Sequence, residues 1–235
     1  MRPEIDTVAL DVRANHARAM LADMFLDQAF GPAALVSSFG AEAAVLLHMV
    51  SEVAPDAPVI FVDTQMLFQE TLDYQLELTQ RFGLKDVRRV TPDSVAVRRN
   101  DIFGRLHLKD TDACCALRKT APLAGALSGF DAWVTGRKRH QTGDRADMKL
   151  IEATDGKIKV NPLAHWSRGD TQSYFARHEL PRHPLVETGF RSIGCAPCTS
   201  PVAAHEDDRA GRWRGSHKDE CGIHIVDGRI VRTAA

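Results

Sequence analysis

The segment that decides the fold is AALVSSFGAEAAVLLHMVSEVAPDAPVIFVD, residues 33–63. It begins with a short apolar run, Ala33–Ser37, which follows a Gly-Pro pair and predicts a buried strand. Ala41–Val53 predicts a helix, and Pro58–Asp63 predicts a second buried strand. Two buried strands joined by a helix form a βαβ unit, whose strands run parallel.

The same alternation continues on both sides of this unit. Apolar residues at helical spacing, the first of them Val12, predict a helix over residues 12–29. Downstream we expect helices over residues 69–82 and 112–127, the latter capped by Asp112, and strands over residues 87–90 and 132–135. Alternating strands and helices predict an α/β fold: a mostly parallel sheet with helices on both faces.

Beyond residue 145 the pattern changes. Residues 148–153 and 157–160 flank Asp155-Gly156 and predict a hairpin, which a short helix over residues 170–178 follows. The alternation around Asp227-Gly228 predicts a second hairpin over residues 223–231. The intervening residues 181–220 are rich in Pro, Gly, Arg and His and show little apolar periodicity, so we expect a mobile C-terminal segment.

Composition narrows the class of protein. The 235 residues include 30 basic and 31 acidic side chains, whereas nucleic-acid-binding domains usually carry a basic excess. A near-neutral chain favours a small anionic ligand over a nucleic acid. The first ten residues, MRPEIDTVAL, do not resemble a signal peptide, and no apolar run is long enough for a membrane span. We therefore expect a cytoplasmic protein that does not enter a membrane.

Five cysteines occur as a tandem pair, Cys114–Cys115, a Cys-x-x-Cys turn, Cys195 and Cys198, and a single Cys221. An odd number without a secretion signal argues against a disulfide framework. Four metal ligands and one reactive thiol would fit this count. Zinc, the more common occupant, and an iron–sulfur cluster both accept four thiolates, and a redox role for the Cys-x-x-Cys pair is a third reading.

Three segments follow predicted parallel strands, where open α/β sheets bind ligands. Ser37-Ser38-Phe39-Gly40-Ala41-Glu42 precedes a helix, whose first N–H groups favour an anion, although an ordinary serine-capped turn has the same sequence character. The loop GRKRHQTGDR, residues 136–145, gathers cations that match sulfate or phosphate oxygens. The third segment is Asp63-Thr64-Gln65, which lies at the end of the strand predicted over residues 58–63.

Two of these patterns resemble known families. The loop over residues 37–42 resembles the modified P-loop of the adenine-nucleotide α-hydrolase superfamily, but it lacks the Ser-Gly-Gly-x-Asp-Ser pattern of members that split ATP. The series Cys114-Cys115, Cys195-x-x-Cys198 and Glu220-Cys221-Gly222-x-His224 resembles the bacterial and plant-type adenylyl sulfate (APS) reductases. The similarity extends from Ser37 to His224.

This resemblance implies a reaction and a set of site residues. It implies thioredoxin-dependent reduction of APS to sulfite and AMP in assimilatory sulfate reduction, with Cys221 as the nucleophile that becomes an S-sulfocysteine. Cys114, Cys115, Cys195 and Cys198 would hold a [4Fe–4S] cluster. Residues 1–200 would form the domain that binds the sulfonucleotide and the cluster, and residues 201–235 a tail that carries the nucleophile. The expected substrate-binding residues are Ser37, Ser38, Phe39, Gly40, Asp63, Lys119, Arg137, Arg139, Gln141, Arg145, Arg209, Arg212 and His224.

Among these, Arg145 is the expected sulfate contact, Arg209 and Arg212 are expected to close over the phosphate, and Lys119 to lie between cluster and substrate. The nearest alternative is a reductase of 3′-phosphoadenylyl sulfate (PAPS), or an enzyme that accepts both substrates. APS is preferred because relatives acting on PAPS usually lack the four cluster cysteines. An ATP-cleaving ligase of the same fold and a non-catalytic zinc scaffold are more distant alternatives. The oligomeric state stays open, a homo-oligomer included.

Overall fold

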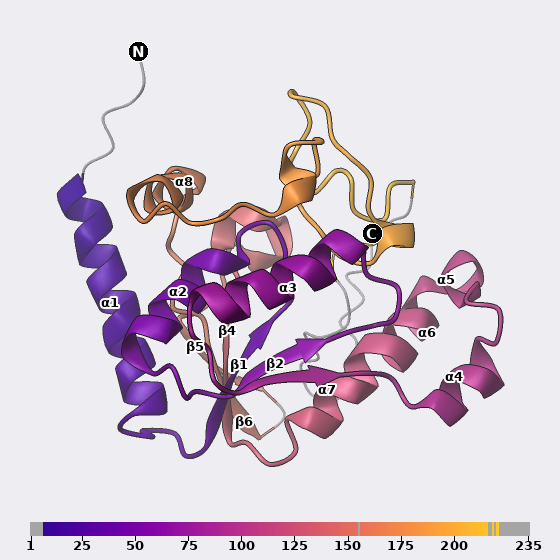
Figure 1. Cartoon of the computed structure of the whole chain (residues 1–235), viewed down its shortest axis with the longest axis horizontal. Helices are drawn as coiled ribbons and strands as arrows, with labels where there is room; N and C mark the ends of the chain where they lie inside the picture. Colours follow the sequence, from indigo (N-terminus) through magenta and orange to yellow (C-terminus); the bar gives the residue numbers. More distant parts are fainter. Residues whose placement is uncertain (1–6, 155, 216–217, 219, 221–235) are drawn as a thin grey trace.

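The computed structural model describes residues 7–154, 156–215, 218 and 220. Its centre is a six-stranded sheet in the order β3-β2-β1-β4-β6-β5, with every pairing parallel except that of β5 with β6 (Figure 1). The strands are β1 (Ala33–Ser37), β2 (Val59–Val62), β3 (Val87–Val90), β4 (Ala132–Thr135), β5 (Ile151–Thr154) and β6 (Lys157–Val160).

The helices connect these strands and cover the sheet. They are α1 (Thr7–Phe25), α2 (Ala43–Val53), α3 (Gln69–Arg81), α4 (Ser94–Asn100), α5 (Leu106–Lys109), α6 (Thr111–Cys115), α7 (Ala121–Ala126) and α8 (Arg168–Arg177). A π-helical turn, η1 (Ala116–Thr120), joins α6 to α7. Short 3-10 turns are η2 (Arg139–Gln141), η3 (Gly143–Arg145), η4 (Pro184–Val186) and η5 (Ala196–Cys198).

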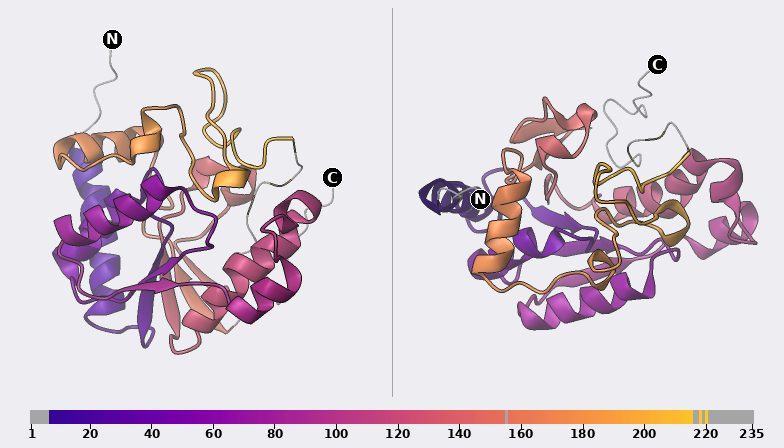
Figure 2. Two further views of the ribbon diagram at one scale, coloured as in Figure 1. Left: turned by 45° about the vertical axis from the view of Figure 1, so that its right-hand side comes forward. Right: turned by 90° about the horizontal axis from the view of Figure 1, so that it is seen from above.

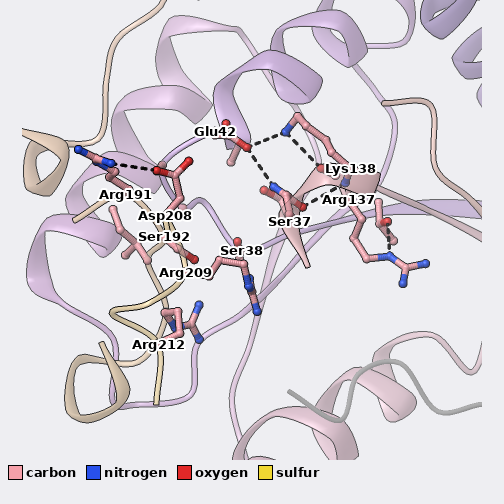
Figure 3. Close-up of a pocket in the computed structure, with 18 of the residues that line it drawn as sticks. Ser37, Ser38, Glu42, Arg137, Lys138, Arg191, Ser192, Asp208, Arg209 and Arg212 are labelled. Carbon is pink, nitrogen blue, oxygen red and sulfur yellow. Dashed lines mark hydrogen bonds and ion pairs between the residues drawn. The ribbon is translucent and has the colours of Figure 1, made fainter. Parts of the chain in front are cut away.

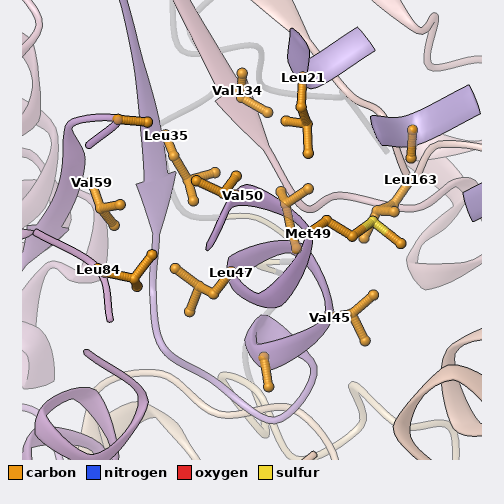
Figure 4. Close-up of a cluster of buried hydrophobic side chains, with 14 of the residues drawn as sticks. Leu21, Leu35, Val45, Leu47, Met49, Val50, Val59, Leu84, Val134 and Leu163 are labelled. Atoms are coloured by element: carbon orange, nitrogen blue, oxygen red, sulfur yellow. The ribbon is translucent and has the colours of Figure 1, made fainter. Parts of the chain in front are cut away.

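The central strands are buried on both faces, and their side chains alternate between two hydrophobic clusters. Leu35 of β1 and Val134 of β4 face the larger cluster, which contains side chains of α1, α2, α3 and α8 (Figure 4). Ala34 and Trp133, their neighbours in the same strands, face a smaller cluster with side chains of α7. This period of two places helices on both faces, as predicted for a doubly covered parallel sheet.

Most of the predicted elements are confirmed. β1, β3 and β4 have the predicted bounds, and β2 is one residue shorter at each end. α3 ends at Arg81, one residue before the predicted end. The predicted hairpin is formed by β5 and β6, in which Thr154 pairs with Lys157, although its first strand begins at Ile151 and not at Met148. The predicted hairpin over residues 223–231 lies outside the described residues.

The predicted helix over residues 12–29 is wrong in its bounds and in one residue of its buried face, whereas Leu21 and Met24 are buried as expected. α1 spans Thr7–Phe25, and Val12, expected on the buried face, is 63% exposed. The chain leaves the helix before Gln28, which has a left-handed backbone (φ 50°). The buried stripe has a spacing of three and four residues and includes two small residues that the prediction overlooked; it consists of Leu10, Ala14, Ala17, Leu21 and Met24.

The predicted helix over residues 112–127 is interrupted. α6 and α7 are separated by the π-helical turn η1, which follows directly after Cys115. The N-cap of α6 is Asp110 and not the predicted Asp112. The Asp110 side chain accepts a hydrogen bond from the Ala113 N–H at 2.8 Å. π-helical turns are often found at functional sites. Helices α4 and α5 were not predicted, because they are short and bury no apolar residue of their own.

The chain order reverses between β1 and β4, and this switch point opens a crevice at the carboxyl ends of the strands. The described C-terminal segment, orange to yellow, lies over that end of the sheet (Figure 2). Among the described residues, no helix combines the length and apolar character needed to cross a bilayer. The fold thus brings the predicted strand-end loops and the C-terminal segment together.

Candidate functional site

A cavity of about 670 Å³ lies at the carboxyl ends of β1, β2 and β4. Its volume falls in the usual range for small-molecule and cofactor sites. Figure 3 shows the loop of Ser37 and Ser38 between Lys138 on one side and Arg191 on the other. The predicted site residues that line the cavity are Ser37, Ser38, Gly40, Lys119, Arg137, Gln141, Arg145, Cys195, Arg209 and Arg212.

The loop after β1 is held in a tight turn. Ser37 Oγ accepts a hydrogen bond from the Phe39 N–H at 3.2 Å, and Phe39 has a left-handed backbone (φ 48°). The Phe39 ring is fully buried against Phe61, at 5.1 Å between centroids. A Cβ added to Gly40 would lie 3.2 Å from the Ile193 carbonyl oxygen. Phe39 therefore shapes the loop from the core, whereas the serines and the N-terminus of α2 face the cavity.

Two other predicted residues have side chains that do not line the cavity. Asp63 accepts a hydrogen bond from the Gln65 N–H at 2.8 Å and an ion pair from Arg89, so it acts as a turn residue after β2. Arg139 donates from Nε to the Met148 carbonyl at 2.8 Å. These contacts use both side chains to hold loops in place.

A buried ion pair joins the loop after β1 to the loop after β4. Lys138, 1% exposed, donates to Glu42 Oε2 at 2.9 Å, and Gln141 Nε2 donates to the same oxygen at 3.0 Å. Burial opposes ionisation of Glu42, but the Lys138 charge and these hydrogen bonds outweigh it and lower the pKa of the carboxyl. Sequence reasoning missed Glu42 and Lys138, because their ion pair joins two loops that are 96 residues apart in the sequence.

Two further arginines of the basic loop differ in their contacts: Arg137 binds residues of the neighbouring hairpin region, and Arg145 faces the C-terminal segment. Arg137 donates to Glu152 Oε2 at 2.6 Å and to Asn161 Oδ1 at 3.1 Å, and burial lowers the pKa of its guanidinium. Arg145 donates to both carboxylate oxygens of Glu220, from Nε at 2.6 Å and Nη2 at 2.8 Å. Arg209 also lies beside this carboxylate, with 3.7 Å between Nη2 and Oε2.

The segment that contributes Arg209 and Arg212 is closely packed against the Cys-x-x-Cys turn. Thr199 forms a β-bridge with Arg212, and a Cβ on Gly211 would lie 2.0 Å from the Ser200 carbonyl oxygen. A Cβ on Gly194 would lie 2.3 Å from the Arg212 guanidinium. Glycine at both positions lets Arg212 reach the cavity.

A second charged group lines the other side of the cavity. Asp208 pairs with Arg168 and with Arg191, the latter at 3.5 Å (Figure 3). Sequence reasoning did not single out these residues. Their pairing depends on contacts between segments that are 17 to 40 residues apart, for which the sequence carries no local signal.

The structure brings the two cysteine pairs together. All four thiols are free of disulfides. Burial, with the neighbouring thiols Cys115 and Cys195, raises the pKa of Cys114 to about 12. Burial, with the same two neighbours, raises the pKa of Cys198 to about 11. Thiols from α6 and from η5 thus interact electrostatically, and a positively charged metal centre would reverse the cost of deprotonating them.

Polar groups surround the cysteines. Thr64 Oγ1 lies 3.2 Å from Cys195 Sγ. Arg118 pairs with Asp101 and donates to the Thr64 carbonyl at 3.1 Å, so it links the cysteine helix to the end of β2. The buried Trp213 Nε1 has no hydrogen-bond partner among the described residues. The Trp213 backbone N–H donates to the Cys198 carbonyl at 3.0 Å, so this unpaired donor belongs to the segment that packs against the Cys-x-x-Cys turn.

A separate histidine group lies away from the cavity. His48, Glu52 and His178 are the only potential metal ligands among the described residues that gather within 4.8 Å as three or more. However, Glu52 accepts two hydrogen bonds from Arg18, and His48 Nδ1 is hydrogen-bonded to the Tyr174 hydroxyl at 2.9 Å. We interpret the group as a structural ion-pair network, because Arg18 already pairs with Glu52 and Tyr174 already binds His48 Nδ1.

Comparison with known proteins identifies the family. The family model described as the phosphoadenosine phosphosulfate reductase domain matches residues 32–201. The chain belongs to this family. The match includes the serine loop, the basic loop and all four paired cysteines, whereas Cys221 and His224 lie outside both the match and the described residues.

Individual members of the reductase family are similar to this chain in sequence and in fold. An adenosine 5′-phosphosulfate reductase of Mesorhizobium japonicum is 50% identical over 202 residues, 86% of this chain and 80% of the relative. One of Chelativorans sp. is 44% identical over 237 residues, 99% of this chain and 96% of the relative. The crystal structure of a PAPS reductase from Candida auris in a phosphate complex covers 80% of this chain and 96% of its own, with TM-score 0.64 and 25% identity.

Proposed function

We propose that this protein is a thioredoxin-dependent APS reductase, which releases sulfite and AMP in assimilatory sulfate reduction. The observation that carries the proposal is one cavity lined by the serine loop of Ser37, by the cations Arg145 and Arg209, and by Cys195 of the thiol site. A sulfonucleotide needs these features together: a phosphate site, cations for its sulfate, and sulfur chemistry beside them. Both curated relatives described above are named adenosine 5′-phosphosulfate reductase.

Different residues of the cavity would bind different groups of the substrate. The N–H groups at the start of α2 and the hydroxyls of Ser37 and Ser38 would bind the nucleotide phosphate. Arg145 presents a two-nitrogen fork, which matches two sulfate oxygens. Arg212 and Lys119 also line the cavity and would spread the negative charge that develops on AMP as it leaves.

The chemistry would begin at Cys221. Its thiolate attacks the sulfur of APS, the sulfur–oxygen bond to AMP breaks, and the electron pair leaves with AMP. The product is a Cys221 S-sulfonate. A thioredoxin thiolate then attacks the Cys221 sulfur and expels sulfite, and the second thioredoxin thiol resolves the mixed disulfide. The two electrons that reduce the sulfonyl group thus come from the thioredoxin dithiol, and we expect this exchange in the cytoplasm.

We further propose that Cys114, Cys115, Cys195 and Cys198 hold a [4Fe–4S] cluster. The mutual electrostatic interaction of the thiols supports one shared metal centre, and the family pattern described above favours a cluster over zinc. The buried Trp213 Nε1 is also available as a donor. When bound, the cluster would supply a fixed local charge beside Lys119.

The alternative substrate is PAPS. The solved Candida auris structure is named as a PAPS reductase, and the family takes its name from that substrate. The four paired cysteines favour APS by the family pattern described above. The test is to purify the protein without oxygen, add thioredoxin and a thiol reductant, and measure sulfite from APS and PAPS side by side. Sulfite chiefly from APS is expected; sulfite from neither, with iron bound, would refute the reductase proposal.

A further inference from the structure

The carboxylate of Glu220 occupies the cation cluster of the cavity. Arg145 binds it through two hydrogen bonds, from Nε to Oε1 at 2.6 Å and from Nη2 to Oε2 at 2.8 Å. Thr142 Oγ1 donates to Oε1 at 3.3 Å, and Arg209 Nη2 lies 3.7 Å from Oε2. Arginine binds sulfate in the same geometry, with two oxygens accepting from two nitrogens of one guanidinium.

This contact is enclosed and charged. The side chains of Arg145 and Glu220 are 11% and 17% exposed. Burial opposes ionisation of Glu220, but the hydrogen bonds and charge of Arg145, with Arg209, lower the pKa of the carboxyl. Glu220 is therefore an anion at neutral pH. An anion inside a cavity that is lined by arginines is where a ligand anion would also bind.

A second ion pair fixes the same segment at the cysteine helix. Lys218 Nζ pairs with Asp112 of α6 and lies 5.7 Å from the centre of the Trp213 ring. The segment that ends at Glu220 is thus attached at two points, one on α6 and one in the cavity. The next residue in the sequence is Cys221.

We propose that Glu220 is an internal competitor of the substrate's sulfate. Without substrate, its carboxylate pairs with Arg145 and Arg209. The substrate's sulfate takes these cations and displaces the carboxylate, so sulfate binding and undocking of the Glu220 side chain are one exchange. This inference rests on the proposed function only for the identity of the anion.

The exchange follows from the number of donors. The Nε–Nη2 edge of Arg145 can bind one bidentate anion, and its Nη1 is already directed to Gln141 Oε1. A sulfate and the Glu220 carboxylate on the same fork would also repel each other. The apparent affinity for a ligand falls by the fraction of molecules that are competent to bind. If Glu220 is docked in nine of ten molecules, removing its charge raises the affinity about tenfold.

The test measures affinity, without turnover. Calorimetry at constant ionic strength gives Kd for inorganic sulfate and for AMP, with anaerobically purified wild type and Glu220→Gln. We expect sulfate to bind about tenfold more tightly to the variant, and Glu220→Asp, which keeps the charge, to bind it less tightly than Glu220→Gln. The matched control is Glu52→Gln, which breaks another two-bond Glu–Arg pair, with Arg18, away from the cavity; its Kd should equal that of wild type.

The results separate this inference from the proposed function. If Glu220→Gln keeps the thermal midpoint of the wild type but binds sulfate no more tightly than the wild type, the competitor role is overturned. Tighter binding supports the role, because loss of a purely structural contact would not increase the affinity for sulfate. Failure of both proteins to bind sulfate or AMP overturns it as well. Sulfite release from APS by wild type is measured independently, so tighter sulfate binding without sulfite release would refute the reductase proposal alone.

Discussion

Replacing Arg118 by Met tests whether the buried pair beneath the thiol site supports the fold. Arg118 and Asp101 have side chains that are 6% and 2% exposed, and Arg118 binds Asp101 Oδ2 from both Nε and Nη2 at 2.9 Å. Arg118 also donates to the Thr64 carbonyl at 3.1 Å, and Thr64 contacts Cys195. Met preserves much of the side-chain length but leaves the Asp101 carboxylate without its cation.

The magnitude follows from that unpaired charge. Removing one partner of a buried pair typically costs about 3–5 kcal/mol. Asp101 retains backbone hydrogen bonds, among them one from the Leu106 N–H at 2.8 Å, so we expect the lower end, about 3 kcal/mol. With a urea m-value of about 2–3 kcal/mol per M, the midpoint should fall by about 1 M.

Urea unfolding followed by circular dichroism measures this change. The control is Arg88→Met, which breaks a forked pair with Asp86 whose side chains are 51% and 34% exposed; such a surface pair contributes about 0–1 kcal/mol. Adding Asp101→Asn to Arg118→Met should restore part of the loss, because it removes the stranded charge. A cost for Arg118→Met no larger than that of the control would refute the reasoning.

Three further predictions concern the tail, the pH response and the thiols. Gly211→Ala should weaken AMP binding by more than tenfold in calorimetry, because its Cβ has no room, whereas Gly129→Ala, with nothing within 4 Å, should not. Burial lowers the pKa of His183 to about 4, so the unfolded chain protonates first and stability is lost as pH falls from about 6.5 toward 4. Between pH 6.5 and 5, urea unfolding should show a loss that is roughly 1.6 kcal/mol larger in the wild type than in His183→Gln; an equal loss in both proteins would contradict this. Cys198→Ser should lose bound iron and Cys221→Ser should keep it while losing sulfite production; iron analysis and the sulfite assay decide both, and retained activity in Cys221→Ser would exclude it as the nucleophile.

Local pattern was enough to predict the sheet. The buried strands read as short apolar runs, because both faces of a parallel sheet are covered, and their bounds were predicted within one residue for β1 to β4. Pattern failed where tertiary contacts override it. The stripe of α1 depends on two small residues, Ala14 and Ala17, that the periodicity underweights. The helix after Asp110 is interrupted by a π-helical turn that directly follows Cys115. The spacing of residues in the sequence does not predict this turn.

The site was predicted in its residue types more than in its contacts. Ser37, Arg145 and Arg209 line the cavity as expected, because the loops that follow parallel strands converge at one edge of the sheet. Asp63 and Arg139 lie in the expected loops, yet their side chains bind neighbouring residues. Which way a side chain turns depends on partners that the sequence does not place.

The sequence by itself determined the fold class, the clustered cysteines and the cationic loop, because each is encoded by residues close together in the chain. Only the tertiary structure decided which charges meet. Lys138 with Glu42, and Glu220 with Arg145, are pairs separated by 96 and 75 residues. The physical reason is that apolar periodicity is a local property, whereas a buried charge acquires its partner only when distant segments pack and exclude water.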